Sequence, residues 1–485
     1  SSYFKDPEYA IYRQPGNMKI PFWLQPVKYY QGAAWYQKKV SIPKSWENKQ
    51  IELFLERCHW ESRVWIDDHE IGMQNSLGTP HRYLLDEYLT PGVHTLTICI
   101  DNRVKEIDPG VNSHSISDHT QTNWNGMIGK LFLEARPVIN IHSVKIFPDI
   151  QKKSITVHYD LKNGLKNAVD VNLYIKVLNI PESAVELPAV QLKPGLNHFS
   201  AELFLGKEMR LWDEFSHNIY TLKSVIQPDI GNSSDSVIHT FGMRSFRVRD
   251  GRITVNNRPV FLRGTLECAI FPETGYPAMN VEEWRRIFKI CLEHGLNHMR
   301  FHSWCPPEAA FEAADQEGFY LQVECSSWAN QSTTLGDSLP IDQYLYDESE
   351  RMTEAYGNHP SFCMMAYGNE PGGGNHVSYL SRFVTHWKEK DERRIYTSGA
   401  GWPNLAENDY LSDPMPRIQH WGEGLASIIN ANPPTSDYSW NDYTDQFAQP
   451  VVSHEIGQWC VYPNFKEIEK YNKVVRAGNF EIFKA

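Results

Sequence analysis

The stretch Phe362-Cys-Met-Met-Ala-Tyr-Gly-Asn-Glu-Pro371 decides the fold of the region around it. Its first six residues form an apolar run, which is typical of a strand buried on both faces of a parallel sheet. The run stops at Gly-Asn369-Glu370-Pro-Gly-Gly-Gly, a composition that predicts a loop. Barrel enzymes carry their catalytic groups at the carboxyl ends of their strands, so the position favours a catalytic Glu370. The alternative is a turn whose Asn and Glu only cap the next helix.

Strand-like runs and amphipathic helices alternate on both sides of this stretch. Residues 281–294 carry apolar side chains three and four positions apart and stop before Gly295, which predicts a helix with a glycine C-cap. Such alternation indicates a parallel sheet, either doubly wound or closed into a barrel. No glycine-rich dinucleotide fingerprint follows the first strand, which disfavours the doubly wound sheet. We expect strands that end at Gly264, His302, Glu324, Glu370, Gly399, His420 and Glu455.

These strand ends number one fewer than a barrel needs. A (β/α)8 TIM-type barrel has eight strands, and the sequence supplies seven candidates. The chain stops at Ala485, inside what we expect to be the helix after the seventh strand. The prediction is therefore a TIM-barrel domain over residues 241–485 that is truncated before strand 8, with its C-terminal part missing.

Two β-rich segments precede the barrel in a chain that is long enough for several domains. Residues 1–139 contain short alternating runs without helical periodicity, which indicates a β-sandwich of jelly-roll type, as in sugar-binding domains. Residues 140–240 place further strand-like runs in about a hundred residues, which is typical of an immunoglobulin-like β-sandwich. The predicted fold class is therefore multidomain, with two sandwiches ahead of the barrel.

Composition narrows the class of protein. A net charge of -12 over 485 residues argues against nucleic acid as a partner, and no apolar run is long enough to predict a membrane span. Hydrophobic residues at 41% and charged residues at 22% are ordinary for a soluble protein, whether cytoplasmic, periplasmic or secreted. Aromatic residues reach 13%, which suits β-rich packing and also stacking on sugar rings.

A second carboxylate is predicted at the end of the seventh strand, in Pro450-Val-Val-Ser-His-Glu455-Ile-Gly. Glutamates on the fourth and seventh strands lie on opposite sides of a barrel mouth. Retaining glycosidases need such a pair about 5–5.5 Å apart, one as acid/base and one as nucleophile. In that case Asn369 is placed to hydrogen-bond the 2-hydroxyl of the sugar. The alternative for Glu455 is a structural carboxylate paired with an arginine.

Other polar and aromatic side chains are expected at the same rim. One such residue alone is more often part of the core than a ligand contact, but their joint placement favours a substrate site. The candidates are Arg263, Glu267, His302, Trp304, Glu324, Trp402, His420, Trp421 and Trp459. A metal on His302, Glu324 and His420 lacks compact ligand spacing, and the eight cysteines contain no CxxC pair. We expect neither a metal nor an organic cofactor, and a bound divalent cation is unsupported.

Several motifs along the chain point to one family. Trp124-Asn-Gly-Met-Ile-Gly-Lys130 looks like the segment that closes a sugar-binding domain, and Leu211-Trp212 followed by residues 218–222 is similar to an immunoglobulin-domain signature. Residues 241–244 and 257–264 match a barrel entrance, and Gly368–Pro371 matches an acid/base motif. Together they resemble glycoside hydrolase family 2, the relatives of β-galactosidase, β-glucuronidase and β-mannosidase. The resemblance implies Glu455 as nucleophile and puts Glu324 at an acidic position of the third strand.

The sequence also departs from the family. His302 lies one position away from the family's Arg-x-x-His pattern, and Met365-Ala-Tyr367 stands where many relatives have Trp-Ser-x. The Asn-x-Lys clamp associated with β-glucuronidases is not seen.

The resemblance implies a retaining exo-β-glycosidase that acts on a glycoside, oligosaccharide or polysaccharide, most similar to β-galactosidases. Specificity like that of β-glucuronidases or β-mannosidases is an alternative. Two others remain: a non-catalytic carbohydrate-binding protein with a degenerate barrel, and a different barrel enzyme such as a transglycosylase or an esterase. The absence of a Gly-x-Ser-x-Gly elbow counts against the esterase.

Overall fold

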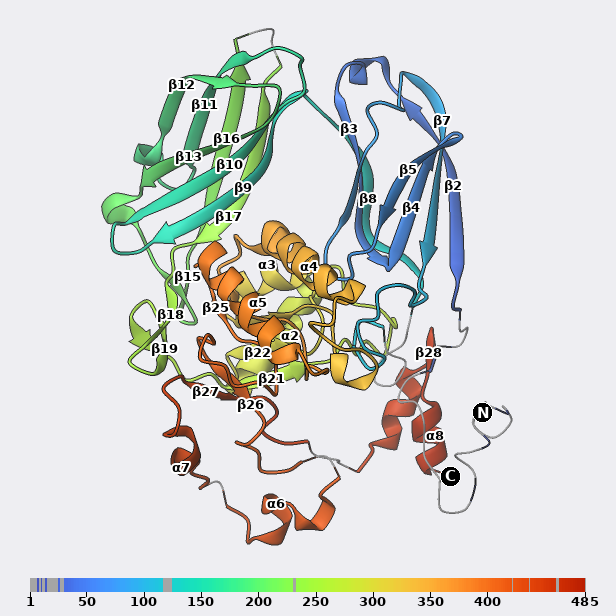
Figure 1. Cartoon of the computed structure of the whole chain (residues 1–485), viewed down its shortest axis with the longest axis vertical. Coiled ribbons are helices and arrows are strands. Elements are labelled where there is room, and N and C mark those ends of the chain that lie inside the picture. Colours follow the sequence, from blue (N-terminus) through green and yellow to red (C-terminus); the bar gives the residue numbers. More distant parts are fainter. Residues whose placement is uncertain are drawn as a thin grey trace.

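The computed structural model describes residues 30–116, 124–229, 233–420, 422–435, 437–458 and 462–484, and near the start Pro7, Ala10, Gln14 and Gln25–Pro26. Two β-rich units lie side by side, and both stand on a third region built of parallel strands and helices (Figure 1). Each unit has its own cluster of buried apolar side chains.

The first unit contains two antiparallel sheets, ordered β2-β7-β4-β5 and β6-β3-β8. Alternation explains how its strands face a core: in β4 every second residue is buried, including Val64 and Ile66. Its strands are β2 (Ala33–Ile42), β3 (Gln50–His59), β4 (Glu61–Ile66), β5 (His69–Gln74), β6 (His81–Leu84), β7 (Gly92–Asp101) and β8 (Gly126–Arg136).

The second unit also has two antiparallel sheets, ordered β13-β10-β9 and β12-β11-β16-β17. Strand β11 buries every second residue, from Val169 to Val177, against the other sheet. Its strands are β9 (Ile139–Asp149), β10 (Ser154–Asn163), β11 (Val169–Val177), β12 (Val185–Leu192), β13 (Gly195–Phe204), β16 (Ile219–Pro228) and β17 (Asp235–Gly242). The short pair β14 (Trp212–Asp213) and β15 (Ser216–His217) projects from it toward the third region.

The third region begins with a small antiparallel sheet of β18 (Phe246–Arg249), β19 (Arg252–Val255) and β20 (Arg258–Pro259). Five parallel strands follow in sequential order, and two more form a separate parallel pair. The five are β21 (Gly264–Glu267), β22 (His298–Phe301), β23 (Tyr320–Glu324), β24 (Phe362–Ala366) and β25 (Ile395–Tyr396), and the pair is β26 (Leu411–Asp413) and β27 (Val451–Ser453).

Backbone bonds connect the five strands to the pair. Asp409 N donates to Tyr396 O at 2.8 Å, and Gly401 N donates to Ser412 O at 2.8 Å. Seven parallel strands thus follow one another along the described part of the chain, and an eighth is not found there.

Two predicted strand ends are wrong. The first strand begins at Gly264 instead of ending there, because the run before it is divided between the antiparallel sheet and a connecting segment. The sixth strand is Leu411–Asp413, seven residues before the predicted end at His420, because Pro414 and Pro416 interrupt the backbone pairing.

Helices cover the five-stranded sheet, as sequence periodicity predicts. The helix α2 (Val281–Glu293) starts where the Asn280 side chain accepts a hydrogen bond from Glu283 N, and it buries Trp284 and Phe288. The others beside this sheet are α3 (Glu308–Glu317), α4 (Pro340–Tyr356) and α5 (His376–Lys390). Around β26 and β27 the helices are only short: α6 (Ile428–Ala431) and α7 (Asn441–Thr444).

The last described segment pairs with residues 25–26. Strand β28 (Val475–Arg476) pairs with β1 (Gln25–Pro26), and α8 (Gly478–Lys484) follows it (Figure 1). Within the described residues, no helix combines the length and the apolar character needed to cross a bilayer.

Candidate active site

The loop after β24 holds Glu370 in a fixed backbone position. Glu370 N donates to Ala400 O at 2.9 Å, and its own carbonyl accepts from Asn330 N at 3.1 Å. Its φ of 33° is unusual for a residue with a side chain, a condition that tends to cluster at functional sites. Gly368 allows this turn, since a Cβ there would lie 2.3 Å from Ser327 O. The loop therefore presents the Glu370 side chain above the neighbouring strands.

The carboxylate of Glu370 has neutral hydrogen-bond donors. Trp328 Nε1 donates to Oε2 at 2.9 Å, and Asn330 Nδ2 donates to the same oxygen at 3.3 Å. Burial raises the pKa of Glu370, and the nearby Glu455 carboxylate raises it further, while these two donors lower it. A carboxyl group with a raised pKa keeps its proton to higher pH, which is what a general acid requires.

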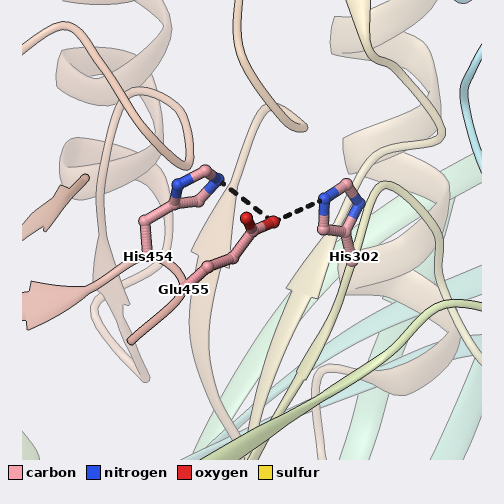
Figure 2. A group of neighbouring side chains, drawn as sticks. All are labelled: His302, His454 and Glu455. Atoms are coloured by element: carbon pink, nitrogen blue, oxygen red, sulfur yellow. Dashed lines mark ion pairs between the residues drawn. The ribbon is translucent and has the colours of Figure 1, made fainter. Parts of the chain in front are cut away.

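Glu455 follows β27 and lies between two histidines (Figure 2). His302 Nε2 is 3.3 Å and His454 Nε2 3.7 Å from its Oε1, while Arg417 Nη2 is 3.5 Å from Oε2. Burial and the Arg300 guanidinium lower the pKa of His302 to about 3, and burial lowers the pKa of His454 well below its usual value. Both imidazoles are therefore neutral at pH 7, and Arg417 is the cation in contact with Glu455.

Arg300 links the second, third and fourth strands at this rim. Its Nε and Nη2 donate to Glu324 at 2.5 and 3.3 Å, and Nη2 also donates to Asn369 Oδ1 at 2.7 Å. Glu324 further accepts from Ser303 N at 2.7 Å, and its side chain is fully buried. Both carboxylate oxygens of Glu324 thus accept hydrogen bonds from Arg300, as expected of a structural carboxylate.

Asn369 is left with one free donor. Because a guanidinium only donates, the atom facing Arg300 is Oδ1, which also accepts from His454 Nε2 at 3.0 Å. The amide nitrogen Nδ2 is buried and has no hydrogen-bond partner among the residues that the structure describes. Buried polar atoms are rarely left unpaired, so Nδ2 is a candidate donor to a bound ligand.

The group of His302, His454 and Glu455 brings three metal-ligand atoms within 4.8 Å of one another. Its hydrogen bonds do not fit a cation. Arg417 Nη2 lies 3.0 Å from His454 Nδ1, so Nδ1 accepts and the proton is on Nε2, which donates to Asn369 Oδ1. A metal ligand needs a lone pair on that Nε2. We therefore interpret the group as a hydrogen-bonding support for Glu455.

Several predicted residues lie near these carboxylates. Glu267 ends β21, accepts from Ala269 N at 3.0 Å, and has its pKa raised to about 7 by burial. Trp402 Nε1 donates to Pro371 O at 3.0 Å, next to the Glu370 loop. Trp304 is 3% exposed and packs against Phe301 and other aromatic rings, with Nε1 bonded to Glu267 O, which is the environment of a core residue.

The remaining predicted positions have different outcomes. The prediction that Arg263 lies at the rim is wrong: it precedes β21, and its Nε donates to Gly295 O at 2.5 Å at the opposite end of the strand. His420 lies in the loop after β26, where its backbone N donates to Glu423 at 2.7 Å. Trp421 and Trp459 lie outside the described residues.

Sequence reasoning missed four residues of the site: His114, Asn330, Arg417 and His454. His454 adjoins Glu455, and Arg417 precedes the predicted strand end by three residues, so their positions in the sequence were the available signal. His114 comes from the loop after β7 in the first unit. No local pattern connects it to a strand 188 residues further along the chain.

Comparisons with known proteins agree on one family. Residues 246–464 match the model described as "Glycosyl hydrolases family 2, TIM barrel domain". The chain is 21% identical over 389 residues to a β-galactosidase of Priestia megaterium, covering 76% of this chain and 36% of that protein. It is 24% identical over 347 residues to a putative β-glucuronidase of Formosa agariphila, covering 70% and 40%.

Solved structures give the same fold. A β-glucuronidase of Bacteroides uniformis superposes with a TM-score of 0.65 at 21% identity, over 78% of this chain and 48% of that one. A β-galacturonidase of Eisenbergiella tayi gives 0.64 at 19% identity, over 76% and 64%. The chain thus spans less than half the length of the curated relatives above.

The parallel strands of the third region are those of a glycosyl hydrolase TIM-barrel domain. Residues 246–464 are thus identified as a family 2 glycosyl hydrolase TIM-barrel domain.

Proposed function

We propose that this protein is a retaining exo-β-glycosidase in which Glu370 is the acid/base and Glu455 the nucleophile. The observation that carries the proposal is the contrast between two neighbouring carboxylates. Glu370 has neutral donors and a raised pKa, while Glu455 has a guanidinium beside it. Double displacement needs such a pair, one group holding a proton and the other ionised.

In the first step Glu370 gives its proton to the glycosidic oxygen as the bond to the leaving group breaks. Glu455 attacks the anomeric carbon, and its oxygen forms an ester with the sugar. Asn369 Nδ2, the unpaired buried donor, is available to the sugar's 2-hydroxyl, a contact that strengthens in the transition state. Arg300 and His454 hold that amide in place through Oδ1.

In the second step Glu370, now ionised, takes a proton from a water molecule. The hydroxide oxygen forms a bond to the anomeric carbon while the bond to Glu455 breaks. The sugar leaves with its original anomeric configuration, Glu370 is protonated again and Glu455 is again a carboxylate.

The proposed substrate is a terminal β-linked sugar on a glycoside, an oligosaccharide or a polysaccharide. We take β-galactosides as the first candidate, because β-galactosidases recur among the curated relatives. β-Glucuronides and β-galacturonides are the second, supported by the names of the structural neighbours. A β-mannoside completes the set of family activities to test.

The experiment is a screen of aryl β-galactoside, glucuronide, galacturonide, mannoside and glucoside. Because this chain spans less than half the length of those two curated relatives, the product of the complete natural reading frame is assayed beside it. We expect turnover of at least one substrate, lost in Glu370→Gln and Glu455→Gln. The control is Glu282→Gln, whose side chain is 82% exposed on α2. A full-length product that binds these sugars but hydrolyses none would instead indicate a carbohydrate-binding protein.

A further inference from the structure

The segment 108–116, which we call the docking loop, leaves the first β unit after β7 and lies against the rim of the parallel strands. Trp328 N donates to Pro109 O at 2.7 Å, and His114 N donates to Ser303 Oγ at 3.0 Å. Ser115 Oγ donates to Ser326 Oγ at 2.8 Å. The docking loop therefore contacts the segments that follow β22 and β23, and these segments support the two carboxylates.

One contact fixes the backbone beside Glu370. Gly110 has a φ of 98°, and a Cβ built there would lie 1.8 Å from Trp328 O. The docking loop thus packs directly on the main chain of Trp328, whose Nε1 donates to Glu370. Only glycine permits this approach.

A second contact reaches Glu455 through two histidines. His114 Nδ1 lies 3.0 Å from the carbonyl oxygen of His302 and 2.9 Å from His302 Nδ1. A carbonyl oxygen only accepts, so His114 Nδ1 carries its proton. We assign His302 Nδ1 as an acceptor of the same N–H, and Ser303 Oγ lies 3.3 Å from His114 Nδ1.

The second proton position then follows. Burial lowers the pKa of His114 well below its usual value, and that of His302 to about 3, so each ring is neutral and holds one proton. With Nδ1 of His302 accepting, its proton is on Nε2, the atom 3.3 Å from Glu455 Oε1. The opposite tautomer would place a lone pair against the carboxylate.

We propose that His114 is a positioning residue for the reaction, contributed by the first β unit: it holds His302 in the tautomer and ring orientation that donate Nε2–H to Glu455. The first unit then has a part in chemistry that occurs on the barrel, through one hydrogen bond. His302 contacts the reacting carboxylate, while His114 acts through His302. This inference rests on the proposed role of Glu455 as nucleophile.

A matched pair of variants isolates the hydrogen bond. An Asn side chain can place an N–H where His114 has Nδ1, whereas Leu has a comparable size and no donor. We expect His114→Leu to lower kcat about tenfold or more with little change in KM. The variant loses the hydrogen bond that orients His302, so the alignment of His302 Nε2–H with the Glu455 carboxylate loosens. His114→Asn should recover most of that loss. The exposed His142 on β9 gives the control, His142→Leu, which should match the wild type.

The readout is kcat, together with the rate at which a 2-deoxy-2-fluoro glycoside labels the protein, in samples with equal melting temperatures. Labelling of Glu455 in the wild type establishes the nucleophile, and its absence overturns the proposed function and this inference together. If the wild type is labelled and His114→Leu is labelled equally fast, only this inference fails. Equal losses in the Leu and Asn variants would also overturn it, since packing and not the donor would then be responsible.

Discussion

Glu370 and Glu455 follow two strands of the same region, yet their surroundings differ. Glu370 follows β24, whose five residues are all buried, and neutral donors face its carboxylate. Glu455 follows β27, whose three residues are half-buried, and a guanidinium lies 3.5 Å from its carboxylate. Burial raises the pKa of Glu370, so this carboxyl keeps its proton to higher pH. This contrast supports the proposed roles of Glu370 as acid and Glu455 as nucleophile.

The strongest way to break this comparison is to remove each carboxylate separately. Glu455→Gln should lower kcat/KM by roughly 10⁴-fold or more with every leaving group, because no ester can form. Glu370→Gln should cost about 10²–10⁴-fold with a poor leaving group, the range of general-acid catalysis. With a dinitrophenyl glycoside its loss in the first step should be much smaller, because that leaving group needs no proton. Pre-steady-state kinetics measure this step, and equal leaving-group dependence in the two variants would contradict the assignment.

A third carboxylate sharpens the comparison. Glu324 accepts hydrogen bonds from Arg300, so we expect it to stabilise the fold and to take no part in the reaction. Glu324→Gln leaves a buried cation unpaired and should lower the free energy of unfolding by about 3–5 kcal/mol. Glu370→Gln removes a carboxyl whose pKa burial raises, so stability at pH 7 should stay the same or increase. Denaturant titrations of the two variants measure the difference. A Glu370 variant that is as unstable as the Glu324 variant would argue for a structural Glu370.

Arg417 supplies the charge that distinguishes Glu455. Arg417→Met should lower kcat/KM about 10–100-fold. Truncating one partner of a buried charge pair costs about 2–5 kcal/mol, and only part of that cost raises the free energy of the transition state relative to the free enzyme. Arg417→Lys keeps the charge but not the planar fork, and should lose less. Steady-state kinetics with the best aryl glycoside measure both. An unchanged kcat/KM in Arg417→Met would show that Arg417 has no part in the reaction.

The smallest expected effect is a shift in pH dependence. Trp328 Nε1 donates to Glu370 and thereby lowers the pKa of that carboxyl. Trp328→Phe removes the donor, so the pKa of Glu370 should rise further. The acid form persists to higher pH, and the basic limb of the kcat/KM profile should therefore move to higher pH. A shift to lower pH would mean that Glu370 is not the group titrating on that limb.

The sequence predicted the strand before Glu370 well, because an apolar run followed by Gly-Asn-Glu-Pro combines a buried strand with an unmistakable loop. It misplaced the sixth strand, since three residues between polar and proline-containing segments carry no periodicity. Alternation shows which residues share a face of a strand, but it could not show that Arg300 binds Glu324 on the neighbouring strand.

Local sequence patterns could not predict how the first β unit contacts the site. His114 reaches His302 from a different unit, and Gly110 fits Trp328 by close backbone approach, so both contacts depend on how the units pack. Hydrophobic periodicity encodes which face of a strand is buried, not which loop of another unit covers its end.

The most direct test of the central claim is the site of covalent labelling. The protein is incubated with the 2-deoxy-2-fluoro analogue of the best glycoside from the substrate screen. Its peptides are then mapped by mass spectrometry. We expect one added sugar on the peptide that contains Glu455 and none on the peptide that contains Glu370. A label on Glu370, or on any other carboxylate, would contradict it.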